Sequence, residues 1–174
     1  FGRSLSGQPV FESFISDFHV AQKPLTAILN GLRPVLIGLD FGLTPAAVIG
    51  QLDARGRLNV FDCLVSEGMG ILRFCTTKLK PLLSAKYAGA SFLVIGDPAG
   101  NQRVQTDEKT IYQVLREQGF KCMPASTNSI VARITAVDQF LCRQIDGGPG
   151  FLVDKGCVEL IAALRGKYRY KVKK

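Results

Sequence analysis

Histidine is nearly absent from this sequence, with His19 as the single example among 174 residues. A Ser-His-Asp triad or a Cys/His zinc site would have to use that one residue, so we expect neither. The five cysteines are odd in number and include no Cys-x-x-Cys pair. This usage indicates a reducing cytoplasm, with most of the thiols packed inside apolar segments. The cysteines are Cys63, Cys75, Cys122, Cys142 and Cys157.

Membrane, secretion and P-loop signals are missing as well. No apolar run reaches the roughly 18–20 residues that cross a bilayer, so no membrane partner is expected. The first ten residues are polar and Gly-rich, lack a signal-peptide pattern and do not begin with Met, so we expect the chain to be cut from a longer one. No G-x-x-x-x-G-K-S/T motif occurs, which predicts that any P-loop ATPase lies outside this chain.

The residues that are present describe one globular domain with a basic surface. Hydrophobic residues make up 47% and charged residues 21% of the chain, which is typical of a folded domain of ordinary size. The formal net charge is +8. A basic excess of this size favours a polyanionic partner such as nucleic acid, because lysine and arginine release counterions from phosphates. A basic surface kept for solubility is the alternative.

The chain divides into an entry segment, residues 1–33, and one α/β domain, residues 34–174. Pro24 and Gly31 interrupt the entry segment, so we expect it to pack on the domain without forming a long element. Apolar runs bounded by turns predict strands, with Gly56 free to adopt a positive φ, and apolar spacing of three and four predicts helices. The expected strands cover residues 34–40, 46–52, 58–65, 91–96, 120–123 and 151–153, and the expected helices cover residues 70–87, 106–118, 130–145 and 154–164.

The order β-β-β-α-β-α-β-α predicts an α/β fold with a mixed sheet flanked by helices. The first helix is expected to kink or break at Pro81. Thr106 or Asp107 is expected to cap the second helix and Gly119 to end it, while Asp154 is expected to cap the last. Residues 147–150 are expected to form a turn, and residues 165–174 (RGKYRYKVKK) a basic, aromatic tail.

Two of the expected strands end in aspartate, Asp40 and Asp97, each followed by a turn rich in glycine and proline. Ligands of open α/β sheets collect beyond the carboxyl ends of strands, so the two carboxylates converge if their strands are neighbours. A hard divalent cation such as Mg²⁺ or Mn²⁺ would relieve their repulsion. Two such ions about 4 Å apart can activate a water and stabilise the leaving oxygen of a phosphodiester. For either residue alone, a role in starting the turn is the simpler explanation.

Residues 36–51 (LIGLDFGLTPAAVIGQ) and 94–115 (VIGDPAGNQRVQTDEKTIYQVL) resemble the nuclease domain of tailed-bacteriophage large terminases, which cut concatemeric viral DNA during genome packaging. The similarity extends over residues 128–141 and 151–170 and the entry segment around 11–21. The resemblance implies a ribonuclease-H-like fold and a metal-dependent endonuclease with two Mg²⁺ or Mn²⁺ ions. The first strand-end acid of the family falls on Asp40 and its fourth-strand acid on Asp97.

The family carries a third acidic ligand on a later helix, which we expect beyond Lys174. Asp154 is interpreted as a helix cap rather than a substitute. Asp107 and Glu108 could reach the metals through water, although favourable charge at a helix N-terminus explains them better. The resemblance also implies an ATPase domain, the portal and the small terminase subunit as partners of the full-length protein, in the host-cell cytoplasm.

Basic residues are expected to hold the backbone of double-stranded DNA without reading its sequence. Tyr168 and Tyr170 interleave with those of the tail, for which a solvated, frayed terminus is the alternative. The candidates are Arg103 after the fourth strand, Arg133 on the following helix, and Lys167, Arg169, Lys171, Lys173 and Lys174 in the tail.

Two other functions fit parts of the sequence. The segment IGLDFGLT also resembles the phosphate-binding hairpin of actin-like and sugar-kinase ATPases, with residues 98–100 as a weak second phosphate loop. Those proteins need two such domains, and this chain has room for one. A non-catalytic DNA-binding or docking module of a packaging machine is the other alternative, because the third acid is missing.

Overall fold

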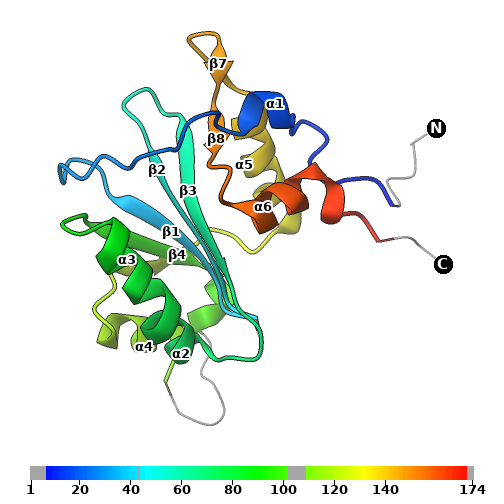
Figure 1. Ribbon diagram of the computed structural model, residues 1–174. Helices are drawn as coiled ribbons and strands as arrows, with labels where there is room; N and C mark the ends of the chain where they lie inside the picture. The colour runs from blue at the N-terminus through cyan, green and yellow to red at the C-terminus, as the bar shows by residue number, and fades with distance from the viewer. Residues whose placement is uncertain (1–6, 43, 102–108, 172–174) are drawn as a thin grey trace.

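The computed structural model describes residues 7–42, 44–101 and 109–171. They form a mixed α/β domain whose sheet is flanked by helices on both faces, which confirms the predicted fold class (Figure 1). The strand order in the sheet is β5-β4-β1-β2-β3-β8. The strands are β1 (Val35–Asp40), β2 (Ala46–Leu52), β3 (Leu58–Val65), β4 (Phe92–Gly96), β5 (Cys122–Pro124) and β8 (Phe151–Val153).

The first three strands pair with one another as an antiparallel meander. Its second turn contains Gly56 at a φ of +82°, a backbone conformation that glycine adopts at little cost. β4 pairs in parallel with β1, β5 pairs in parallel with β4, and β8 pairs in parallel with β3. The carboxyl ends of β1, β4 and β5 therefore lie along one edge of the sheet.

One face of the sheet is covered by α2 (Ile71–Phe74), the π-helical segment η1 (Cys75–Leu79), α3 (Lys80–Lys86) and α4 (Ile111–Glu117). Pro81 was expected to kink or break the first helix. The helical segments follow one another without a gap, so the helix does not break there. Proline cannot donate a backbone hydrogen bond, and the turn before Pro81 is π-helical. The apolar residues between these helices and the sheet form what we call the first core, which consists of Val35, Ile37, Leu39, Ala47, Ile49, Phe61, Phe74, Cys75, Leu79, Leu83, Tyr87, Val94, Tyr112, Leu115 and Phe120.

The other face is covered by α1 (Ser16–His19), α5 (Ile130–Cys142), α6 (Val158–Ala162) and the π-helical segment η3 (Ala163–Lys167). His19 is buried there, and it accepts a hydrogen bond from the Ile15 N–H at Nδ1 and lies 3.0 Å from the Leu141 carbonyl oxygen at Nε2. The single histidine therefore joins the entry segment to α5. The second core consists of Phe14, Val60, Leu141, Phe151, Val153, Cys157 and Leu164.

The beginning and the end of the described chain lie side by side. The Val10 N–H donates to the Tyr168 carbonyl at 3.1 Å, and the Tyr170 N–H donates to the Gln8 carbonyl at 3.0 Å. The predicted basic tail is therefore tied to the entry segment as far as Tyr170. No helix among the residues that the structure describes is long and apolar enough to cross a membrane.

Two predicted helix caps are wrong. Thr110, rather than Thr106 or Asp107, caps α4, because its hydroxyl accepts from the Gln113 N–H while the Gln113 side chain accepts from the Thr110 N–H. Gly119 follows that helix at a φ of +86°, as expected of a glycine that ends it. The helix predicted from Asp154 begins only at Val158. The Asp154 carboxylate instead accepts from the Leu25 and Gly156 N–H groups and anchors the entry segment.

The helix predicted for residues 130–145 is three residues too long. α5 ends at Cys142, and the chain then forms a hairpin of β6 (Gln144–Ile145) and β7 (Gly148–Pro149). Asp146 and Gly147 connect these strands with φ values of +52° and +75°, the pair of positive angles that a two-residue hairpin turn requires. The predicted fifth strand also shifts, from residues 120–123 to β5.

Candidate active site

The structure brings the two predicted aspartates together. Leu39 of β1 pairs with Gly96 of β4 in parallel register, so Asp40 and Asp97 are the next residues on two adjacent strands. Neighbouring strands lie about 4.8 Å apart. Asp40 is exposed and Asp97 is half-buried, and both line one cleft with a volume of about 460 Å³ at the carboxyl edge of the sheet.

Each aspartate also shapes the turn that follows it. Asp40 Oδ1 accepts from the Gly42 N–H at 3.2 Å, and Asp97 Oδ1 accepts from the Ala99 N–H at 2.7 Å. A carboxylate bonded to the backbone two residues ahead is the usual turn-forming arrangement of aspartate. This bond occupies one oxygen of each side chain, and Asp40 Oδ2 has no ion pair or hydrogen bond within the described part of the chain. The turn role and a ligand role are therefore compatible.

The ring of Phe41 packs against Gly96 and Gly100, on either side of Asp97. A Cβ atom at Gly96 would come within 2.7 Å of Phe41 Cε2, and one at Gly100 would come within 2.6 Å of the same atom. The ring also meets Tyr112 edge to face at 5.4 Å between centroids. Burial raises the pKa of Tyr112, whose hydroxyl donates to the Asp97 carbonyl at 3.0 Å. The phenylalanine and glycines of the two sequence blocks thus pack together beneath the carboxylates.

Arg133 closes the cleft from the side of α5. Its Nη1 lies 3.6 Å from Asp97 Oδ2 and donates to Asn128 Oδ1 at 3.1 Å. Ser129 caps the helix by accepting from the Ala132 N–H, which sets the position of Arg133 one turn into it. Sequence reasoning selected Arg133 but missed Asn128 and Thr127, of which Thr127 lines the cleft. Both residues directly precede Ser129, the N-cap of α5, and this position in the sequence could have indicated that they lie near Arg133.

The predicted site residues of the described part of the tail lie outside the cleft. Lys167, Arg169 and Lys171 belong to the tail, and none of them lines the cleft. Arg169 instead donates to the Gly7 carbonyl at 3.2 Å. The remaining predicted residues fall outside the described residues: Arg103, Asp107, Glu108, Lys173 and Lys174.

The cleft offers hard oxygen donors of the kind that Mg²⁺ and Mn²⁺ prefer. Asp40 and Asp97 would hold such an ion together with water, because Mg²⁺ usually keeps several waters and binds one or two carboxylates. Within the described ranges, no three His, Cys, Asp or Glu side chains form a possible metal group. The metal site and its third acidic ligand therefore stay predictions.

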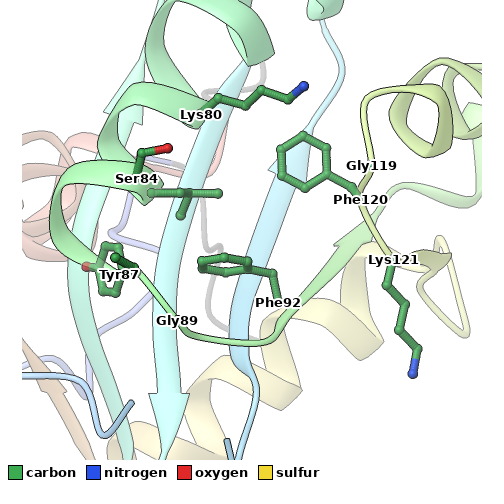
Figure 2. Close-up of a pocket in the computed structure, with 10 residues that line it drawn as sticks. Lys80, Ser84, Tyr87, Gly89, Phe92, Gly119, Phe120 and Lys121 are labelled. Atoms are coloured by element: carbon green, nitrogen blue, oxygen red, sulfur yellow. The ribbon is translucent and has the colours of Figure 1, made fainter.

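A larger hollow, of about 550 Å³, lies at the opposite end of the sheet (Figure 2). Phe92, at the start of β4, and Phe120 line it, with Tyr87 on the wall formed by α3 and Lys80 extending toward Phe120. Lys80 and Lys121 line it, and none of its described lining residues carries a carboxylate. It therefore lacks the acidic groups of the cleft and is a separate feature.

The strand order and the helices on both faces define a ribonuclease-H-like fold. Among solved structures, the nuclease domain of the P22 large terminase aligns with 98% of this chain and 87% of its own, with a TM-score of 0.68 and 14% identity. The large terminase of a thermophilic bacteriophage aligns with TM-scores of 0.66 and 0.63 in two crystal forms, each at 16% identity. The chain thus has the fold of the nuclease domain of phage large terminases.

The alignment with the terminase of the thermophilic bacteriophage covers 90% of this chain but only 36% of that protein, so the chain spans about a third of its length. No protein-family model and no curated protein matches the sequence.

Proposed function

We propose that this chain is a metal-dependent endonuclease module that cuts concatemeric double-stranded DNA during viral genome packaging. The observation that carries the proposal is the pair Asp40 and Asp97, which extend two adjacent parallel strands into one cleft beside Arg133. Two carboxylates and an arginine in one cleft suit a divalent cation and a phosphate. The fold shared with the nuclease domain of the P22 large terminase supports it.

The residues of the cleft have distinct roles in this proposal. Asp40 and Asp97 would hold Mg²⁺ or Mn²⁺, as one ion or a pair, and such metal would supply water activation and charge stabilisation at the leaving oxygen of the phosphodiester. Arg133 holds the phosphate next to the scissile bond, since its guanidinium can form two parallel hydrogen bonds to phosphate oxygens. Tyr112 and Phe41 keep the Asp97 turn in place from below.

Contacts outside the cleft would bind the DNA backbone. Arg103, Lys167, Arg169 and Lys171 remain candidates for this role, and contacts to phosphates carry no sequence information. We therefore expect similar cleavage of unrelated duplexes. In the full-length protein, the module would work with an ATPase domain, the portal and the small terminase subunit in the host-cell cytoplasm.

A nicking assay on supercoiled plasmid with Mn²⁺ tests the proposal. The unchanged chain should nick the plasmid, and EDTA should stop it. Asp40→Asn and Asp97→Asn should each reduce nicking to background while DNA binding persists, because each removes a metal ligand and leaves the side-chain volume unchanged. Asp17→Asn, on the exposed surface of α1, is the matched control. Equal nicking by all four proteins would indicate a contaminating nuclease and refute the assignment.

The second candidate is a DNA-binding or docking module without catalysis. It is favoured by the finding that the described residues supply two carboxylates rather than three. Binding of plasmid DNA without nicking at any Mn²⁺ concentration would establish it. The nucleotide-binding alternative is less well supported, because Gly100 of the expected second phosphate loop is buried against Phe41 and Tyr112. Thermal stabilisation of the chain by ATP would support that alternative.

A further inference from the structure

A second hollow adjoins the cleft along α5. We call it the aromatic groove, and its volume is about 410 Å³. Arg133 and Val137 line both the cleft and the groove, so the two hollows meet at these side chains. The groove is lined by Phe11, Ile130, Arg133, Ile134, Val137 and Tyr168.

The groove presents aromatic and aliphatic surface to solvent. Tyr168 is 50% exposed and Ile130 is 64% exposed, so much of this apolar surface is left uncovered. The rings of Phe11 and Tyr168 lie 6.2 Å apart between centroids, with 31° between their planes. Both rings line the groove, so a further flat ring can pack against either of them by offset or edge-to-face stacking.

Phe11 and Tyr168 are held in place by backbone pairing in the absence of a ligand. Tyr168 belongs to the tail and Phe11 to the entry segment, and the hydrogen bonds at Val10 and Tyr170 hold these two segments together. An isolated bridge between Pro9 and Arg169 adds to this pairing. A ligand therefore does not have to order two loose chain ends, which removes part of the entropic cost of binding.

The charge and position of the groove indicate what occupies it. Among the described residues that line it, Arg133 is the only charged one, and none carries a carboxylate. A ligand that fits must offer a flat apolar ring with an anionic group close by. A nucleobase attached to its phosphate has this form, and the adjoining cleft is where the phosphate of such a strand would lie under the proposed function.

We propose that the aromatic groove holds an unstacked nucleobase of the DNA strand that passes through the cleft. The inference rests on the proposed function in taking the ligand of the cleft to be DNA. Extracting a base from an intact duplex costs free energy. The chain should therefore bind most tightly to DNA in which a nucleotide is already unpaired.

The test compares two duplexes of equal length, one fully paired and one carrying a single bulged 2-aminopurine, bound to the whole chain in EDTA so that no cleavage occurs. Affinity is measured by fluorescence anisotropy of an end label, and stacking by quenching of 2-aminopurine. Tyr168→Ala should weaken binding of the bulged duplex about tenfold, a typical loss for one aromatic stacking partner, and should relieve the quenching. Tyr168→Phe keeps the ring and should behave like the unchanged chain.

Two further variants keep the test decisive. Ile130→Glu should weaken binding of the bulged duplex without unfolding the chain, because Ile130 is exposed and a carboxylate at the first position of a helix is favourable. Leu72→Ala changes an exposed apolar residue on α2, outside the groove, and should change the affinity for neither duplex.

Equal affinity for both duplexes, or quenching that persists in Tyr168→Ala and Ile130→Glu, would overturn the inference and leave the groove to a protein partner. The nicking assay reports separately on the cleft. An inactive chain that still quenches the bulged base would retain the groove as a DNA site and lose only the nuclease.

Discussion

The two faces of the sheet are assembled in different ways. The first core is drawn from one continuous stretch of chain, from Val35 to Phe120. The second core joins the two ends of the chain, with Phe14 from the entry segment packed against residues as late as Leu164. The first core therefore packs against the strands that lead to Asp40 and Asp97. The second core positions α5, which brings Arg133 to the cleft. The candidate site depends on both faces, but through contacts of different range.

The largest effect should come from removing a ring in the first core. Phe74 is wholly buried, so Phe74→Ala should lower the free energy of unfolding by roughly 3–5 kcal/mol through lost burial and the cavity that remains. Phe14→Ala removes the same atoms from the second core, where the ring is 9% exposed, and should cost less. Urea denaturation measures both values.

Native-state hydrogen exchange sharpens this comparison. Phe14→Ala should speed exchange mainly in residues 7–28 and 158–171, which can open without breaking the meander. Phe74→Ala should speed exchange throughout β1, β2 and β4. Equal losses of stability, with the same exchange pattern in both variants, would show that the two cores unfold as one unit.

An intermediate effect is expected where the first core supports the cleft. Gly96→Ala places a methyl group on the Phe41 ring, and overpacking of this kind costs about 1–3 kcal/mol. The double variant Gly96→Ala/Phe41→Leu should recover part of the loss, because the smaller side chain leaves room. Gly70→Ala is the control, since nothing lies within 4 Å of a Cβ there. Thermal unfolding of the four proteins measures this, and a double variant no more stable than Gly96→Ala would contradict the packing argument.

The sequence predicted the first four strands accurately for a physical reason. β2 and β3 occupy the residues expected, and β1 and β4 begin one residue later. Each is an apolar run bounded by turn residues, so its boundaries are set locally. The convergence of Asp40 and Asp97 needed only the added assumption that their strands are neighbours, which the parallel pairing of β1 and β4 satisfies.

The errors have two sources. Two of the errors missed local motifs. These were the capping box of Thr110 and Gln113 and the hairpin turn of Asp146 and Gly147. The capping box lay inside a helix that was predicted to begin too early, and the hairpin turn directly followed a helix that was predicted to end too late. Asp154 could not be placed from local sequence, because it anchors Leu25, which is 129 residues away in the chain. The contact between Arg133 and Asp97 was equally inaccessible, because it depends on how α5 lies against the sheet.

The smallest predicted effect is a difference in thiol reactivity between the two cores. Burial raises the pKa of Cys75 in the first core to about 11. A hydrogen bond from the Cys157 thiol of the second core lowers the pKa of Cys63 to about 7. The thiolate is the reactive form and its fraction rises with pH. Iodoacetamide should therefore modify Cys63 about fivefold faster at pH 7 than at pH 6, with little further gain above pH 8, while Cys75 stays unmodified.

Peptide mapping by mass spectrometry at several pH values measures this contrast. Cys157→Ala removes the hydrogen-bond donor and should move the pH midpoint of Cys63 labelling upward, whereas Cys157→Ser keeps a donor and should move it less. Cys75→Ala, in the other core, should leave the profile unchanged. A Cys63 midpoint that does not respond to Cys157→Ala would show that the second core does not tune this thiol, and the chemical difference between the two faces would then reduce to burial alone.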